Sequence, residues 1–372
     1  MRRFGVTVRS AGILAAATLG AGIFSLPYVT AQAGWMPAIC LLTVLSVVII
    51  FVHRLYWRAL DAERDREPLL DRMRTRFGAG AYAFGLAVIG GGLLLTLVAY
   101  LILGGYFLRL VVPSLDPTIA LLLVWVLSTA TLGERLRVFA TAETLAAALK
   151  AALILLVLVS IGHADFSGVP VARSAGALAA TGAILFALAG WTGIEPMFGY
   201  ERRSGRSAGS PSGAVVWGTV AVGVLYALFA IAVLGSGAVP SPDTLTGLIH
   251  VWPWWKVTAL AVLGLLTIWT AYASVGRELL ASLAANARIG KTTAALIVGG
   301  VPLLLVASGS MRSFVGTIEL VGGVFLALQY VCLVAVSIAT VRLRSLAACA
   351  AYSVLAVFLC IALYEIYVFV LH

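Results

Sequence analysis

The segment from Gly20 to Pro27 interrupts an apolar run that extends from about residue 11 to residue 30. A run of that length is long enough to span a bilayer as a helix. Gly20, Gly22 and Pro27 weaken such a helix, because each glycine costs roughly 1 kcal/mol and proline removes a backbone donor. Broken backbone at membrane depth is tolerated only where protein or a wet cavity covers it. The pattern predicts a discontinuous helix whose freed backbone groups hold a small polar solute.

The composition is that of a polytopic membrane protein. The chain is 62% hydrophobic and 11% charged, whereas a soluble domain carries about 25% charged residues. The four cysteines all fall in apolar runs, so they indicate neither a disulfide framework nor a zinc site. The net charge of +10 comes from arginines whose distribution indicates membrane orientation, so we do not expect a nucleic-acid partner. We therefore expect the lipid bilayer as the main partner, with no metal and no organic cofactor.

Hydropathy predicts an all-helical domain with about eleven spans. The third and tenth are longer than a bilayer needs, so we expect tilt or extension beyond the membrane. The expected spans are 11–31, 35–53, 80–112, 117–133, 143–162, 175–199, 213–235, 254–276, 293–310, 313–341 and 346–370.

Basic residues gather in alternate loops, which sets the expected orientation. Seven arginines lie between Arg54 and Arg76, in a segment that we interpret as a solvated surface helix. With this segment and the N-terminus in the cytoplasm, few basic residues remain outside. An odd number of spans then places His372 outside. We expect a multi-pass protein of a bacterial-type plasma membrane.

The N-terminus also imitates a secretory signal. Two arginines precede the first apolar run, and Ala31-Gln32-Ala33 follows it like a cleavage site. The run is long for a signal core and contains the Gly/Pro break. We therefore expect it to be a retained span.

A second break interrupts the sixth expected span, where Gly190, Gly193 and Pro196 follow an apolar stretch. It lies five spans after the first break, so the two helices run in opposite directions. Paired breaks of this kind are typical of inverted repeats with a binding site at their interface. We expect repeats at about 11–162 and 175–341 and an extra helix at about 346–370. The alternative is that these small residues only permit close helix packing.

Two facing breaks suit a zwitterion. The N-terminal end of a half-helix presents free N–H groups and a positive dipole end, which attract a carboxylate. The C-terminal end of another half-helix presents free carbonyls, which attract an ammonium group. An amino acid needs both ends in one place.

Three stretches resemble a known group of permeases. The segment Gly20-Ala-Gly-Ile-Phe-Ser-Leu-Pro-Tyr28 with Ala31-Gln-Ala-Gly-Trp35 resembles the first helix of the amino acid/auxin permease family. That family belongs to the amino acid–polyamine–organocation (APC) superfamily. Phe186-Ala-Leu-Ala-Gly-Trp191 is similar to the superfamily's sixth-helix motif, although Thr192 stands where that motif often has Glu. Ala273-Ser-Val-Gly-Arg277 and Arg288-Ile-Gly-Lys291 look like the end of the eighth helix and its loop.

The resemblance implies a transporter and assigns its site. The backbone of the first break would bind the substrate carboxylate, and that of the second break would receive the amino group. An aromatic gate would cover the substrate from outside. The implied residues are Ala21, Gly22 and Ile23 for the carboxylate, Phe186, Ala187 and Ala189 for the amino group, and Trp191 for the gate, with Gly20, Gly190 and Thr192 as further substrate-binding candidates.

Lys150 is the most informative ionisable residue, because a lysine inside a span is costly unless paired, hydrated or neutral. It resembles a fifth-helix lysine that replaces a bridging sodium ion in several permeases of the superfamily. Snorkelling to the cytoplasm is the ordinary alternative. We favour coupling to a proton gradient, or sodium-independent transport, with Glu195 as a further coupling candidate. The alternative is a sodium symporter with a site near Gly20, Thr270 and Ser274.

Other functions have less support in the sequence. The four histidines are scattered, and we find no nucleophile–base grouping, so we do not expect an enzyme. A channel would need rings of charge or a polar path. A non-transporting amino acid sensor on the same fold is a further alternative. For the buried acids Glu319 and Glu365, hydrogen bonding to neighbouring helices is the ordinary account. The sequence leaves open which L-amino acid is carried and the oligomeric state.

Overall fold

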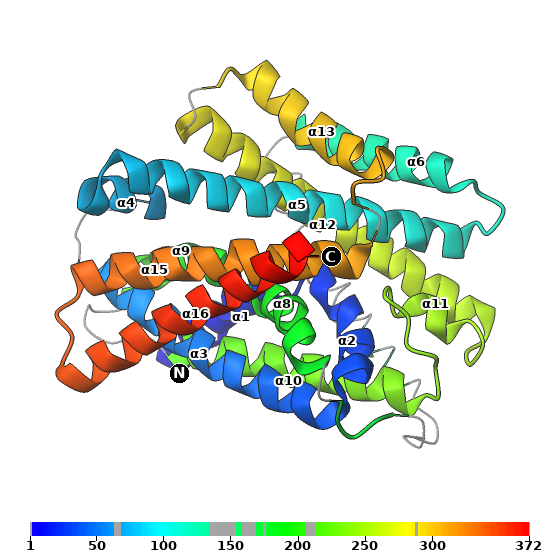
Figure 1. Cartoon of the computed structure of the whole chain (residues 1–372), viewed down its shortest axis with the longest axis horizontal. Coiled ribbons are helices and arrows are strands. Elements are labelled where there is room, and N and C mark those ends of the chain that lie inside the picture. The colour runs from blue at the N-terminus through cyan, green and yellow to red at the C-terminus, as the bar shows by residue number, and fades with distance from the viewer. Residues whose placement is uncertain are drawn as a thin grey trace.

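The protein is helical along its described length, and its long helices run roughly side by side (Figure 1). The computed structural model describes residues 2–62, 68–133, 154–155, 157, 159, 169–173, 176–205, 213–286, 289–311 and 313–371. The expected fifth span, 143–162, lies almost wholly outside these residues.

The helices of the first half follow the expected spans one to four. They are α1 (Arg2–Thr18), the 3-10 helix η1 (Ala21–Ser25), α2 (Leu26–Ala33), α3 (Trp35–Ala62), α4 (Leu69–Phe77), α5 (Ala79–Val111), α6 (Pro117–Ala130) and the short 3-10 turn η2 (Thr131–Gly133).

The helices of the second half follow spans six to eleven. They are α8 (Gly176–Leu188), η3 (Trp191–Gly193), α9 (Ile194–Arg203), α10 (Gly213–Gly235), α11 (Leu245–Leu248), α12 (Trp254–Asn286), α13 (Lys291–Ala307), α14 (Phe314–Leu320), the π-helix η4 (Val321–Leu326), α15 (Ala327–Thr340) and α16 (Ser345–Leu371).

Six of the described helices are long and apolar enough to cross a membrane, namely α3, α5, α10, α12, α14–α15 and α16. The first span is broken, because Gly5–Thr18 and Ala21–Ala33 meet at an angle of 56°. The shorter helices α6 and α13 are also apolar. The chain is therefore a multi-pass membrane protein, while the count of eleven spans stays a prediction.

Several helices extend beyond the ends that hydropathy predicted. The second continues from residue 53 to Ala62, and the eighth continues from residue 276 to Asn286. Hydropathy marks only the apolar part of a helix, whereas the backbone continues for as long as one face can pack. At the end of α3, Trp57 packs edge-on against Phe198 of α9, with ring centroids 5.3 Å apart.

The helix α4 corrects the expectation of a solvated surface helix. Its side chains Leu69, Leu70 and Met73 are buried, and Arg72 is only 1% exposed. The guanidinium of Arg72 donates a hydrogen bond of 3.2 Å to the carbonyl of Ala59. A long basic side chain can be covered in this way when main-chain acceptors meet its head group.

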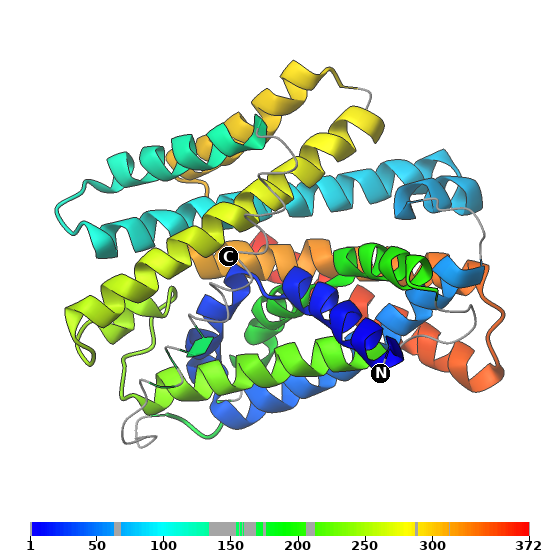
Figure 2. The same cartoon turned by 180° about the vertical axis from the view of Figure 1, so that it is seen from behind.

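The two ends of the helical array serve as reference points. One end, the α4 side, carries α4 and the last turns of α12 and α15 (left in Figure 1). The opposite end, the α11 side, carries α11 and the link between α5 and α6. Seen from behind, α1 runs alongside α10 near the α4 side (Figure 2).

Candidate functional site

The first break has the form that Gly20 and Gly22 predicted. Helix α1 ends at Thr18, and Gly20 is extended, with φ −121° and ψ −166°. Ala21 and Gly22 open η1 and are buried. The first N–H groups of a helix have no intrahelical acceptor, so they face the gap. Pro27 lies in the first turn of α2, where a missing N–H costs little.

The second break has the same form. Helix α8 ends at Leu188, a 3-10 turn begins at Trp191, and α9 begins at Ile194. Gly193 donates to the carbonyl of Gly190 over 3.0 Å. The carbonyl of Phe186 accepts from Ala189 over 3.3 Å. This carbonyl is therefore partly occupied before any substrate arrives.

The two breaks lie against each other at backbone distance. A methyl group on Gly22 would stand 2.7 Å from the Cα atom of Ala187. A methyl group on Gly190 would stand 2.0 Å from Oγ1 of Thr18. No side chain fits between these segments. The structure thus brings together the two groups of residues to which the family resemblance assigns the carboxylate and the amino group.

Tyrosines from neighbouring helices hold both breaks. The hydroxyl of Tyr226, on α10, donates a hydrogen bond of 2.9 Å to the carbonyl of Thr18 at the end of α1. The hydroxyl of Tyr330, on α15, interacts with the backbone of Gly190 and lies 3.3 Å from Nε2 of His53. Neither tyrosine could be predicted from the sequence, because a tyrosine in an apolar helix has no local signal of what it faces.

On the α11 side, aromatic packing closes the site. Phe24 of η1 is fully buried against Phe107 and Phe229, with ring centroids 4.8 Å and 6.3 Å away. The hydroxyl of Thr244, next to α11, donates to the carbonyl of Phe24. This arrangement leaves the first break without an opening toward α11 at Phe24.

On the α4 side, a cavity of about 150 Å³ reaches the second break. Trp191, Thr192 and Glu195 line it from η3 and α9, and Glu278 faces them from α12. The hydroxyl of Tyr56 donates to Oε1 of Glu195 over 2.5 Å. Glu278 was missed because the eighth span was expected to end at residue 276. The structure thus adds a second carboxylate beside the coupling candidate Glu195.

Trp191 is held in place from the tenth span. Its indole N–H donates to Oε1 of Gln329 over 2.8 Å, and Gln329 in turn donates to the carbonyl of Val88. The role of Trp191 as a gate stays a prediction.

Only some of the expected ion-coupling residues lie among the residues that the structure describes. Lys150 lies outside the described residues. Thr270 and Ser274 lie on α12, which packs against η1. The hydroxyl of Thr270 donates to the carbonyls of Leu266 and Thr267, each over 3.0 Å. The sodium site stays a prediction.

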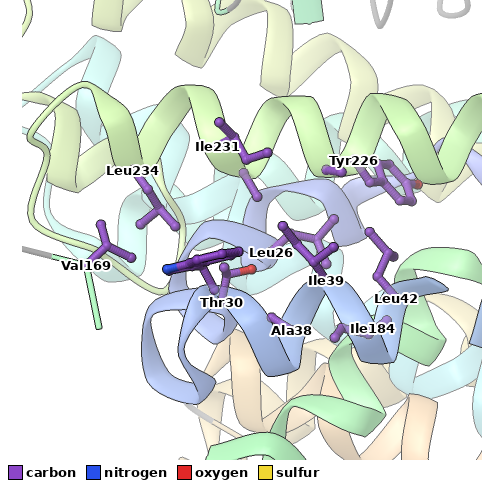
Figure 3. Close-up of a pocket in the computed structure, with 13 residues that line it drawn as sticks. Leu26, Thr30, Ala38, Ile39, Leu42, Val169, Ile184, Tyr226, Ile231 and Leu234 are labelled. Atoms are coloured by element: carbon purple, nitrogen blue, oxygen red, sulfur yellow. The ribbon is translucent and has the colours of Figure 1, made fainter. Parts of the chain in front are cut away.

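A separate cavity of about 340 Å³ lies between α2, α3 and α10. Figure 3 shows Leu26, Ile39 and Leu42 on one wall and Ile231 and Leu234 on the other. This lining is mostly hydrocarbon. None of the residues that line it is charged, so it does not suit a zwitterion.

Solved transporter structures share this fold. The Eremococcus coleocola manganese transporter, in complex with an aromatic bis-isothiourea substituted compound, matches 96% of this chain and 85% of its own at 12% identity and a TM-score of 0.65. MhsT in complex with L-phenylalanine matches 96% and 98% at 14% identity and a TM-score of 0.61. Mhp1, a nucleobase-cation-symport-1 family transporter with bromovinylhydantoin bound, matches 88% and 75% at 14% identity and 0.59. At these identities the likeness shows the fold alone.

No curated protein matches the chain. Residues 5–268 match the model of a family described as "Transmembrane amino acid transporter protein". The match covers more than half of the chain and includes both breaks. The chain therefore belongs to the transmembrane amino acid transporter family, and it is a multi-pass membrane transporter.

Proposed function

We propose that the chain is a secondary active transporter of an L-amino acid that works by alternating access. One observation carries this proposal: the two broken helices meet at Gly22 and Ala187 and again at Thr18 and Gly190. Helix starts and helix ends then share one place, as the carboxylate and ammonium groups of a single small solute require.

In this proposal, the N–H groups of Ala21 and Gly22 bind the carboxylate at the start of η1. The carbonyls of Ala187 and Ala189 receive the amino group, and Trp191 with Thr192 borders the substrate. Both breaks are buried, so these backbone groups act in a poorly screened environment where hydrogen bonds to charged groups are strong.

Alternating access gives the two sides of the site different roles. The closure around Phe24 on the α11 side and the cavity at Glu195 on the α4 side support a state open toward α4. If the arginine-rich segment lies on the cytoplasmic side of a bacterial-type plasma membrane, this state is open to the cytoplasm. The 11–162 and 175–341 repeats then exchange the open side by rocking around the fixed breaks.

Coupling to protons is the favoured mode, with sodium as the alternative. A proton route is supported by the two carboxylates at the α4-side cavity, Glu195 and Glu278, and by the lysine at position 150. A sodium route would use Gly20, Thr270 and Ser274.

The test is transport by the full chain in proteoliposomes. Counterflow across a panel of L-amino acids should identify a substrate, and uptake in sodium-free buffer should follow an imposed proton gradient. Uptake that stops without sodium would overturn proton coupling. Undiminished gradient-driven uptake by Lys150→Ala would remove Lys150 from the mechanism. Amino acid binding in a thermal-shift assay without counterflow would indicate a sensor instead.

A further inference from the structure

Two acidic side chains from different helices lie at one helix interface outside the candidate site. Glu319 lies on α14 and Glu365 on α16, both within helices apolar enough to cross a membrane. Glu365 is only 8% exposed. Glu319 is half-buried, and the two carboxyl groups interact electrostatically.

The pair lies where α8 packs on the π-helix η4. A methyl group on Gly323 of η4 would stand 2.2 Å from Cγ of Glu365 and 2.8 Å from its Oε1. A methyl group on Gly182 of α8 would stand 2.5 Å from the carbonyl oxygen of Glu319. The carboxyl of Glu365 also interacts with the backbone of Gly182. The pair therefore touches the half-helix that leads to the second break.

No basic residue stands in the helices that form this interface. The sequences of α8, α14, η4, α15 and α16 contain neither lysine nor arginine. Oε1 of Glu365 is buried and has no hydrogen-bond partner among the described residues. An unpaired, buried carboxylate oxygen is costly in apolar surroundings.

Other titratable groups on the packed helices face elsewhere. On α15, Tyr330 points to His53, and Cys332 is a buried thiol. On α5, Tyr100 lies near Gly20, Tyr82 faces Arg74 of α4, and Tyr106 with Arg109 lines a cavity on the α11 side. On α16 itself, the remaining titratable side chains are largely exposed, as Tyr352, Tyr364, Tyr367, Cys349 and Cys360 show.

We propose that Glu319 and Glu365 form an intramembrane proton-binding site, which holds one shared proton while α8 is docked on η4. Two carboxylates at one apolar interface do not both ionise readily, because each charge opposes the other. A single proton converts the pair into a donor and an acceptor, and it then belongs to the pair rather than to either residue.

Loss of that proton has a structural consequence. It leaves two negative charges beside Gly182. Their repulsion is relieved only if the helices separate or water enters the interface. The contact between α8 and η4 is tightly packed, since a methyl group on Gly322 would stand 1.8 Å from the carbonyl oxygen of Gly182. Proton occupancy is thus linked to the position of α8. Because Ala189 directly follows the end of α8, it is also linked to the second break. This link to transport rests on the proposed function, whereas the proton site itself does not.

Infrared spectroscopy of the purified full chain near neutral pH tests the site without substrate. The double variant Glu319→Gln/Glu365→Gln should lose protonated-carboxyl absorbance equivalent to one group per protein. Tyr364→Phe, next to Glu365 but 37% exposed, should lose none. Equal absorbance in wild type and double variant would overturn the proposal. Glutamine mimics the protonated form, so failure of the double variant to fold would also contradict it.

Transport tests the link to α8. The ratio of proton-gradient-driven accumulation to counterflow should fall in Glu365→Gln by about 5- to 150-fold, the usual range for coupling between sites. The ratio should be unchanged in Tyr364→Phe. An unchanged ratio in Glu365→Gln would overturn the link. Absence of counterflow in the wild type would contradict the proposed function instead, and the infrared measurement would still decide the proton site.

Discussion

The indole N–H of Trp191 donates a hydrogen bond of 2.8 Å to the side-chain oxygen of Gln329. It joins the break in the sixth span to the middle of the tenth, across 138 positions of sequence. Both side chains are buried. The orientation of Trp191 at the cavity therefore depends on a partner from another helix.

Removing this partner should loosen Trp191. We expect Gln329→Met to cost about 1–3 kcal/mol, because it leaves the indole N–H buried without an acceptor. Thermal unfolding of Gln329→Met, Trp191→Phe and the double variant completes a double-mutant cycle. A coupling energy of about 1 kcal/mol is expected, and additive effects would show that the bond contributes nothing.

The contact between the breaks should not tolerate a side chain. Gly22→Ala places a methyl group 2.7 Å from the Cα of Ala187, and such overpacking typically costs about 1–3 kcal/mol. We expect weaker amino acid binding and slower counterflow. Gly12→Ala on α1 is the matched control, since its added methyl group meets nothing within 4 Å beyond the adjoining residues and backbone of its own helix. Equal behaviour of the two variants would contradict the tight contact.

The hydrogen bond from Tyr226 to the carbonyl of Thr18 should stabilise the end of α1. Tyr226→Phe keeps the ring but removes the donor, which should cost about 1 kcal/mol of unfolding free energy. Faster hydrogen exchange around residues 18–22 should accompany the loss. Tyr352→Phe, at a side chain that is 58% exposed, serves as control. Unchanged exchange in Tyr226→Phe would show that the break is held by other contacts.

Asp116 should make the start of α6 sensitive to acid. The backbone N–H groups of Thr118 and Ile119 donate to its carboxylate and hold its pKa below the usual value. The stabilisation is therefore complete above the unfolded pKa near 3.8 and is lost as pH falls through the lower folded value. Hydrogen exchange at Thr118 and Ile119 should rise in that window. Asp116→Asn keeps an acceptor and should abolish this pH dependence.

The positions of both breaks were predictable because their cause is local. Gly20, Gly22 and Pro27, and again Gly190 and Pro196, interrupt apolar runs regardless of what surrounds them. Both discontinuities appear at these glycines, while the prolines fall within the first turns of α2 and α9. Hydropathy likewise predicted most span positions. It ended the eighth helix too early, however, so Glu278 was not recognised as a residue of the site.

The sequence by itself determined the membrane class and the two discontinuous helices, because apolar runs, glycines and prolines act on their own segment of chain. The tertiary structure alone decided which atoms meet: Gly22 with Ala187, Tyr226 with Thr18, and Gly323 with Glu365. Those contacts join helices far apart in sequence. Which face of an apolar helix turns inward depends on its neighbours, and these neighbours exist only once the bundle has packed.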